Sequence, residues 1–285
     1  MTGAPLAPRT IHVAHSPDSD DAFMFYALAE GRVETPFTYV HELSDIESLN
    51  QRARRGELEV SAVSIHAYAY LADRYALMAS GSSMGDGYGP RLVSLAARPA
   101  DPRQTLAGRR VGVPGLYTTA YLVLKLYQPD IQPVVMPFDQ IEDAVQAGQV
   151  EVGLLIHEGQ LTYADTGLHL WEDLGAWWMR DTGLPLPLGG NVVRRDLGRE
   201  VIEQVAHDVR ASVEYALAHR AAALGHAKQY SRGLSDARAD EFVGMYVNQW
   251  TVDYGPVGRR AVQVLLDRAA EAGLIPHHVQ VEFVG

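Results

Sequence analysis

The sequence contains no cysteine, so disulfide bonds, thiolate nucleophiles and cysteine-ligated metals are excluded from any mechanism. It also lacks an apolar run close to the roughly 18 residues that a membrane-spanning helix requires. Residues 1–10 include prolines and no apolar core of the length found in a secretory signal. From these absences we expect a cytoplasmic protein that does not insert into a membrane.

Basic residues are scarce: 24 Lys and Arg stand against 35 Asp and Glu, which gives a formal net charge of −11. Nucleic-acid binding requires clustered Lys and Arg. The short cluster of Arg52, Arg54 and Arg55 is flanked by acidic residues and is interpreted as a solvated helix face. We therefore expect no nucleic-acid partner, and the oligomeric state stays open.

Common metal and nucleotide motifs are not matched. His157-Glu158 lacks the second histidine of a His-Glu-x-x-His zinc helix, and the acidic residues 18–21 lack the downstream Gly and Glu of a calcium loop. The glycines of segment 112–115 match neither the phosphate loop that ends in Gly-Lys-Ser/Thr nor Gly-x-Gly-x-x-Gly. We expect neither a metal nor an organic cofactor.

The 285 residues suffice for one large α/β domain or for two lobes. Short apolar runs alternate with segments of helical periodicity, which is typical of mostly parallel strands joined by helices. The predicted strands are 11–14, 37–40, 60–63, 92–96, 110–113, 132–136, 152–156 and 191–194. The predicted helices are 21–30, 45–56, 66–71, 119–127, 138–147, a short one from Gly159, and then 199–219, 221–230, 235–247 and 255–272.

A connector rich in Pro and Asp at 98–103 precedes a new strand, turn and helix, which predicts a lobe boundary near residue 100. We predict that residues 1–97 and 190–285 form lobe 1 and that residues 98–189 form lobe 2. Strands 92–96 and 191–194 would cross at a hinge, with a ligand cleft between the lobes.

The segment 12–26 places a strand, an acidic turn and a helix start within about fifteen residues. Polar groups at such a junction form the ligand sites of α/β folds. Three carboxylates are more than capping of the helix requires, so Asp18 and Asp20 are candidate ligand-binding residues. Capping and complementarity with the helix dipole remain the alternative.

Segment 112–122 is a second candidate, because Thr118 and Thr119 stand at a helix start after two glycines. First-turn N–H groups and hydroxyls converge there and bind carboxylates or phosphates without a basic side chain. Plain N-capping by Thr118 is the alternative. A related strand end at 60–68 offers Ser61 and Ser64 as donors or caps, and the Gly/Ser-rich loop 80–89 is predicted to be flexible and to line the cleft mouth.

The apolar strand 152–156 ends abruptly in His157-Glu158-Gly159. This position puts the imidazole at the carboxyl edge of a strand, where ligands of open α/β sheets lie. An ordinary histidine pKa near 6.5 suits proton abstraction close to neutrality. We predict that His157 is a general base, with a structural role as the alternative.

These segments together resemble the 1,4-dihydroxy-6-naphthoate synthase family of the futalosine route to menaquinone. The resemblance spans residues ~11–270, and its more specific parts are the decapeptide 16–25 and the segment His157–Gln160. It implies a fold like the type II periplasmic binding proteins and the cleavage of cyclic dehypoxanthine futalosine to 1,4-dihydroxy-6-naphthoate and dihydroxyacetone.

The resemblance also implies roles for single residues. His157 matches the proton acceptor of the family, and Ser61, Ala62, Val63, Ser64, Thr118 and Thr119 match or adjoin its substrate-binding segments. Binding of the sugar-derived hydroxyls by Asp18 and Asp20 is our own addition. Two alternatives stay open: a non-catalytic binding or sensor protein for small carboxylates with the same fold, and the related chorismate-dehydrating enzyme of menaquinone biosynthesis.

Overall fold

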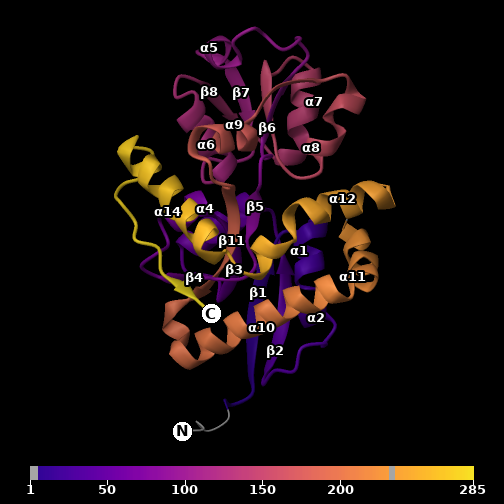
Figure 1. Ribbon diagram of the computed structural model, residues 1–285, viewed down its shortest axis with the longest axis vertical. Helices are drawn as coiled ribbons and strands as arrows, with labels where there is room; N and C mark the ends of the chain where they lie inside the picture. The colour runs from indigo at the N-terminus through magenta and orange to yellow at the C-terminus, as the bar shows by residue number, and fades with distance from the viewer. Residues whose placement is uncertain (1–5, 231–234) are drawn as a thin grey trace.

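The computed structural model describes residues 6–230 and 235–285, which form two lobes stacked along the long axis of the molecule (Figure 1). The larger lobe contains a seven-stranded sheet and the smaller lobe a five-stranded sheet. Residues 1–5 lie outside the described residues. They belong to the predicted lobe 1 and to the N-terminal segment 1–10, which has no signal-like apolar core. The predicted α/β class and the two-lobed architecture are confirmed.

The larger sheet is built around β1 (Arg9–His15), which pairs in parallel with β2 (Phe37–Leu43) and with β3 (Val60–Ser64). All five residues of β3 are buried, as expected for a strand inside a covered sheet. Strand β11 (Leu186–Arg194) runs antiparallel to β3 and to β4 (Tyr75–Met78). The edge partners are β5 (Ser83–Gly85) beside β11 and β12 (Phe283–Val284) beside β4.

The smaller sheet has the strand order β10 (His169–Asp173), β6 (Arg91–Ser94), β9 (Val152–Leu155), β7 (Arg110–Val113) and β8 (Gln132–Val135). Strand β7 is parallel to its neighbours, whereas β6 is antiparallel to both of its own. The described strand pairs of the two sheets divide equally between parallel and antiparallel, so the expectation of mostly parallel strands is wrong. The strands that follow a crossing between the lobes, β6 and β11, run antiparallel to their neighbours in the sheet.

Two segments carry the chain between the sheets: residues 86–90 and residues 174–185, the latter including α9 (Leu174–Thr182). The predicted hinge strand 92–96 corresponds to β6, which pairs within the smaller sheet. Strand β11 lies in the larger sheet from its first residue onward. The lobe division at residues 97 and 189 stays a prediction. The sheets differ from it in two places: β6 belongs to the smaller sheet, and the start of β11 belongs to the larger one.

The predicted helix 21–30 is two helices, α1 (Ser19–Met24) and α2 (Tyr26–Ala29). Phe25 separates them with φ −91° and ψ 2°, which is outside the helical region. Its buried ring stacks on the His15 ring, with centroids 4.6 Å apart. Hydrophobic periodicity carries no sign of this contact, which explains why a single helix was predicted.

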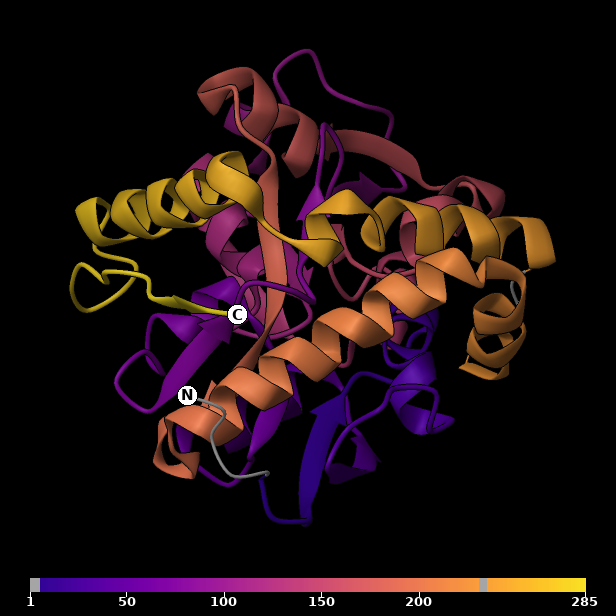
Figure 2. The same ribbon diagram turned by 60° about the horizontal axis from the view of Figure 1, so that its bottom comes forward.

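The C-terminal third is helical, as predicted. Helix α10 (Arg199–Ala218) runs diagonally across the larger lobe in Figure 2, and α11 (Arg220–Ala227) and α12 (Asp236–Tyr246) follow it. Helix α14 (Gly255–Glu271) packs against β11 and also contacts α6 (Thr119–Tyr127) of the smaller lobe.

The sequence predictions missed β4, β5, β10, β12 and the helices α5 (Pro102–Leu106), α9 and α13 (Gln249–Val252). Most of these elements are too short to show a period. Strand β5 lies inside the predicted loop 80–89, where Ser80 and Ser82 are buried. The other helices are α3 (Ile46–Arg54), α4 (Ile65–Tyr68), α7 (Ile141–Gln146) and α8 (Gly159–Thr162).

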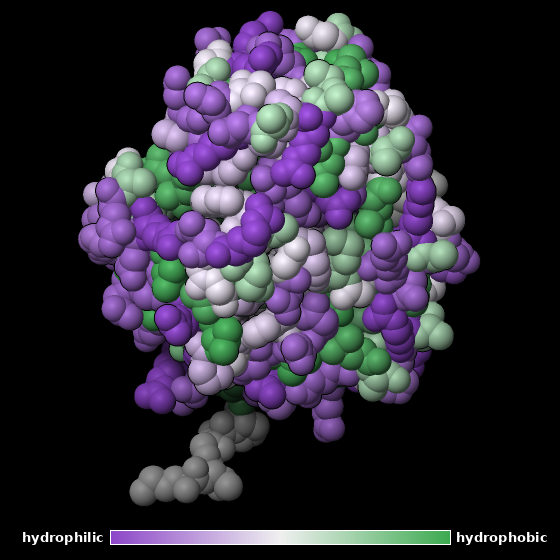
Figure 3. Space-filling view, turned by 45° about the horizontal axis from the view of Figure 1, so that its top comes forward, coloured by the Kyte–Doolittle hydropathy of each residue, from purple (hydrophilic) through white to green (hydrophobic). Residues whose placement is uncertain are grey.

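Hydrophilic residues dominate the face drawn in Figure 3, and hydrophobic residues form small separate groups on it. The large hydrophobic residues that are exposed are likewise scattered along the chain, for example Val40, Leu95 and Val257. Among the described residues, no helix has the length and apolarity needed to cross a membrane.

The two crossing segments touch each other through glycine. The backbone N–H of Leu174 donates a hydrogen bond of 2.9 Å to the carbonyl oxygen of Pro90. A Cβ atom at Gly175 would lie 1.9 Å from the carbonyl oxygen of Tyr88, and one at Gly89 would lie 3.0 Å from the Cα of Gly175. The backbones approach so closely that a side chain at residue 175 does not fit.

We predict that Gly175→Ala lowers the free energy of unfolding by about 1–3 kcal/mol or more, because the two crossing segments must separate. Gly225→Ala is the matched control, since it lies in α11 with nothing within 4 Å of the added Cβ. The control should be neutral or more stable by up to ~1 kcal/mol through helix propensity. Urea unfolding of both variants checks this, and equal stability of the two would contradict it.

Candidate active site

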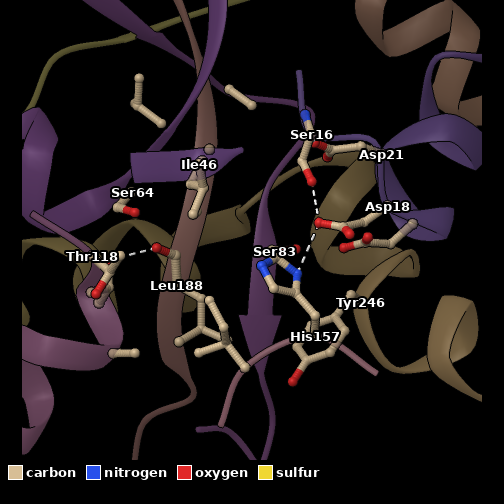
Figure 4. Close-up of a pocket in the computed structure, with 18 of the residues that line it drawn as sticks. Ser16, Asp18, Asp21, Ile46, Ser64, Ser83, Thr118, His157, Leu188 and Tyr246 are labelled. Carbon is tan, nitrogen blue, oxygen red and sulfur yellow. Dashed lines mark hydrogen bonds and ion pairs between the residues drawn. The ribbon is translucent and has the colours of Figure 1, made fainter. Parts of the chain in front are cut away.

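A pocket lies between the lobes, with about 780 Å³ of atom-free space that includes its open mouth. Figure 4 shows Ser64, Thr118 and Leu188 on one side of it and Asp18 and His157 on the other. The predicted site residues that line it are Asp18, Asp20, Ala62, Val63, Ser64, Thr118, Thr119 and His157.

Ser61 is the predicted residue that the structure leaves outside the pocket lining. It is fully buried in β3, and its hydroxyl donates a hydrogen bond of 2.8 Å to the carbonyl oxygen of Ala62. Alternation along the strand turns Ser61 to the sheet face opposite Ala62 and Ser64. This position does not support substrate binding by the Ser61 side chain, and the assignment stays a prediction.

Asp18 and His157 form an ion pair across the gap between the lobes. Asp18 follows β1 in the larger lobe and is 1% exposed, and its Oδ2 lies 2.9 Å from Nδ1 of His157. The Ser16 hydroxyl donates a second hydrogen bond to the same carboxylate (Figure 4). His157 follows β9 in the smaller lobe, so the pair exists only while the lobes lie together.

The backbone at His157 is itself unusual. Its φ of +59° makes it the one non-glycine residue in the left-handed region among the described residues. Such a conformation is sparsely populated and is found preferentially at functional sites. It turns the side chain at the end of β9 back toward the pocket, where the ring packs against Phe138 with centroids 4.4 Å apart.

The charges around His157 decide its protonation. Burial on its own lowers the pKa of His157, but Asp18, Asp20 and Glu158 together outweigh burial and raise that pKa to about 9. The second ring nitrogen, Nε2, is buried and has no hydrogen-bond partner among the described residues. His157 therefore has one nitrogen held by Asp18 and one nitrogen available for a ligand.

Two further carboxyl groups lie next to this pair. Burial, and after it the charge of Asp18, raises the pKa of Asp20 to about 7. Burial and the charge of Asp20 raise the pKa of Asp21, whose Oδ2 accepts a hydrogen bond of 2.8 Å from the backbone N–H of Ser16. Asp18 is the N-cap residue of α1, but its side chain makes no capping bond to the helix. Its carboxylate instead pairs with His157. No group suited to hold a metal ion occurs in the described ranges.

The opposite side of the pocket presents hydrogen-bond donors. Asn50 holds Ser64 with both ends of its amide: Nδ2 donates to the Ser64 hydroxyl oxygen over 3.1 Å, and Oδ1 accepts from the Ser64 backbone N–H over 2.9 Å. Because the Ser64 oxygen already accepts, its proton is available to a ligand.

The two threonine hydroxyls are engaged within the protein. Thr118 donates to the carbonyl oxygen of Gly115 over 2.9 Å and caps α6 through the backbone N–H of Tyr121. Thr119 donates to the carbonyl oxygen of Leu188 over 2.6 Å. Thr118 is therefore the N-cap of α6. The first-turn N–H groups of Thr119 and Ala120 have no intrahelical partner, and carboxylate binding at this helix start stays a prediction.

Several pocket residues were not foreseen from the sequence, chiefly those of β11 and α12: Leu188, Gly189, Gly190, Asn191, Phe242 and Tyr246. Helix α12 contacts the smaller lobe through the Tyr246 hydroxyl, which donates a hydrogen bond of 2.7 Å to Oε1 of Gln160. A polar residue inside an apolar strand, Asn191, was the available signal. Ser83 has Gly-x-Ser-x-Gly spacing but stands on strand β5 and not on a strand-to-helix elbow.

The fold and the pocket define the class: two α/β lobes with a ligand cleft between them, as in periplasmic binding proteins. The alkanesulfonate-binding protein SsuA of Xanthomonas axonopodis pv. citri shares this fold with a TM-score of 0.67 at 16% identity, covering 98% of both chains. A protein from Archaeoglobus fulgidus, solved by X-ray crystallography, is far more similar, with a TM-score of 0.89 and 47% identity over 93% of this chain and 98% of that one.

The chain belongs to the menaquinone biosynthesis family, which it matches over residues 11–271. Its relatives include the 1,4-dihydroxy-6-naphthoate synthases of Thermus thermophilus, 44% identical over 93% of this chain and 95% of that protein, and of Streptomyces coelicolor, 41% identical over 95% and 96%. The family resemblance drawn from the sequence motifs is confirmed.

Two hydrogen-bonded histidines, His15 and His41, lie next to the acidic turn. His15 Nδ1 lies 3.0 Å from the carbonyl oxygen of Ser16, which can only accept, so this nitrogen carries the proton. His15 Nε2 then accepts from His41 Nδ1 over 3.1 Å. Burial, followed by the charge of His41, lowers the pKa of His15 to about 3, and burial lowers the pKa of His41 to about 4.

We predict a loss of stability in mild acid that originates at His15. A lowered folded-state pKa means that the unfolded chain binds the proton more readily, so stability is lost as pH falls below about 6.5. The loss from His15 at pH 4.5 is roughly 2–3 kcal/mol. Urea unfolding at pH 7 and 4.5 should show a smaller loss for His15→Phe than for wild type. The exposed control His207→Phe should behave as wild type, and equal losses in all three would contradict the assignment.

Proposed function

We propose that the protein is a 1,4-dihydroxy-6-naphthoate synthase, a carbon–carbon lyase that converts cyclic dehypoxanthine futalosine to 1,4-dihydroxy-6-naphthoate and dihydroxyacetone. Two relatives of that name match it over nearly their whole lengths. The observation that carries the proposal is that His157 and the Ser64 and Thr118–Thr119 segments line one pocket. A biosynthetic role with a small carboxylated substrate supports the cytoplasm as its location.

The donor side of the pocket suits the aryl carboxylate of the substrate. The first turn of α6 supplies two N–H groups and the positive end of the helix dipole, and Ser64 supplies a hydroxyl proton. Recognition by backbone N–H groups needs no lysine or arginine, in keeping with a pocket lining that contains neither. The bicyclic ring would then extend from α6 toward His157.

His157 is proposed as the general base. Asp18 fixes the ring through Nδ1, which leaves Nε2 to accept the proton whose loss starts carbon–carbon cleavage. Aromatisation of the new ring supplies most of the driving force. Because the carboxylates hold the pKa of His157 near 9, the ring must first lose a proton before it can act as a base.

A non-catalytic binding protein of the same fold is the alternative from another class. The likeness to the sulfonate-binding protein speaks for the fold alone. A buried histidine with one nitrogen fixed by a carboxylate and the other left open favours proton transfer over binding alone. The related chorismate-dehydrating enzyme is disfavoured, since both relatives named above carry the synthase name.

We predict that His157→Gln lowers kcat by roughly 10²–10⁴-fold while substrate affinity stays within a few-fold of wild type. Mass spectrometry of naphthoate formed from cyclic dehypoxanthine futalosine measures turnover, and calorimetry measures binding. Phe138→Leu, which removes the ring beside the imidazole, is the control for packing and should cost far less. A His157→Gln enzyme with wild-type kcat would refute the base assignment.

We predict that kcat/KM of wild type rises with pH toward about 9, because only the deprotonated ring accepts a proton. Asp18→Asn removes the charge that raises the pKa of His157, so the rising limb should move to lower pH. Its plateau should fall by about 10²-fold or more, since the ring is no longer held in one tautomer. A pH–rate profile of both enzymes measures this, and a limb that does not move would count against the pairing.

A further inference from the structure

Asn191 is a buried polar residue in the middle of β11, where apolar residues are the rule. It pairs with Ala62 of β3, is 1% exposed and contributes to the pocket lining. The mechanism described above does not use it. A buried polar side chain needs hydrogen-bond partners, so the question is which group pairs with that of Asn191.

The amide of Asn191 is held in one orientation by its nitrogen. Nδ2 donates a hydrogen bond of 2.9 Å to the carbonyl oxygen of Gly81 and lies 3.4 Å from Sδ of Met24. The reverse orientation would set the amide oxygen against the Gly81 carbonyl, which offers no proton. Gly81 has a φ of +82°, and a Cβ there would lie 2.4 Å from Nδ2, so the backbone is shaped to receive this amide.

The other end of the amide is left open. Oδ1 of Asn191 is buried and has no hydrogen-bond partner among the described residues. Buried amide oxygens are almost always satisfied, and one that is fixed in place at a pocket wall is suited to accept a proton from a ligand. The group that fits is a hydroxyl, because carboxylates and ring carbons offer no proton.

The position of Asn191 tells which part of the substrate it faces. Its contact with Met24 places it beside α1, whose first turn carries Asp20 and Asp21. Gly189, two residues earlier on β11, pairs with Ser64 on the donor side. Two residues along a strand span about 7 Å, so Asn191 stands roughly one ring further from the carboxylate-binding end.

We propose that Asn191 is a specificity-determining residue whose Oδ1 accepts a hydrogen bond from a hydroxyl of the sugar-derived part of the substrate. This inference rests on the proposed function and adds the group that recognises the portion released as dihydroxyacetone. The acceptors Asp18, Asp20 and Asn191 then form the hydroxyl-binding end of the pocket, opposite the donors of α6 and Ser64.

The test compares two ligands in a His157→Gln background, which is expected to bind substrate with near wild-type affinity and greatly reduced turnover. Calorimetry gives the affinities for cyclic dehypoxanthine futalosine, which carries the portion released as dihydroxyacetone, and for 1,4-dihydroxy-6-naphthoate, which keeps its two ring hydroxyls but lacks that portion. Adding Asn191→Leu should weaken the first by about tenfold and leave the second nearly unchanged. Asn191→Ser serves as a second, smaller variant with the same expectation, and circular dichroism confirms that each is folded.

Asn50→Leu is the matched control, since this buried asparagine holds Ser64 at the carboxylate end. It should weaken both ligands alike. An equal loss for both ligands in the Asn191 variants, or no loss for either, would overturn the proposal. Naphthoate formation by wild type is scored separately: its absence refutes the proposed function while the binding comparison still decides on Asn191, and a protein that binds neither ligand overturns both.

Discussion

The ion pair between Asp18 and His157 is the interaction on which the pocket depends, because its two members come from different lobes. A buried pair of this kind contributes little net stability, since desolvation offsets most of the attraction. Its value lies in position: it turns one imidazole nitrogen toward the larger lobe and leaves the other for a ligand. The relative placement of the lobes and the protonation of His157 are thus linked.

Helix α12 strengthens the same link from the C-terminal third. On its inner side the Tyr246 hydroxyl reaches Gln160 of the smaller lobe. On its outer side Arg238 forms an ion pair with Asp165, in the 3-10 helix η2 (Tyr163–Thr166). A segment that is remote in sequence from every predicted motif therefore closes one wall of the pocket, and it does so by contacts made only in the folded chain.

The pocket is polar in a directional way. Donors gather at the start of α6 and at Ser64, whereas the carboxyl groups of Asp18 and Asp20 gather on the other side, beside His157. Under the proposed function, this pattern would hold a ligand with a carboxylate at one end and hydroxyls at the other in a single orientation. The hydroxyls of Thr118 and Thr119 donate to the carbonyl oxygens of Gly115 and Leu188, so the N–H groups of the first turn are the donors that remain at this helix start.

Local patterns in the sequence were enough to predict the α/β class, eight strands, the C-terminal helices and the polar residues at the ends of β1, β3 and β9, because hydrophobic periodicity and polar strand ends are local properties. Tertiary structure alone decided that β6 joins the smaller sheet, that Ser61 faces away from the pocket, and that Asn191 faces into it. It also decided the pKa of His157, which depends on carboxylates brought from another lobe. Strand pairing, burial and charge proximity arise between segments distant in the chain, and no local pattern encodes them.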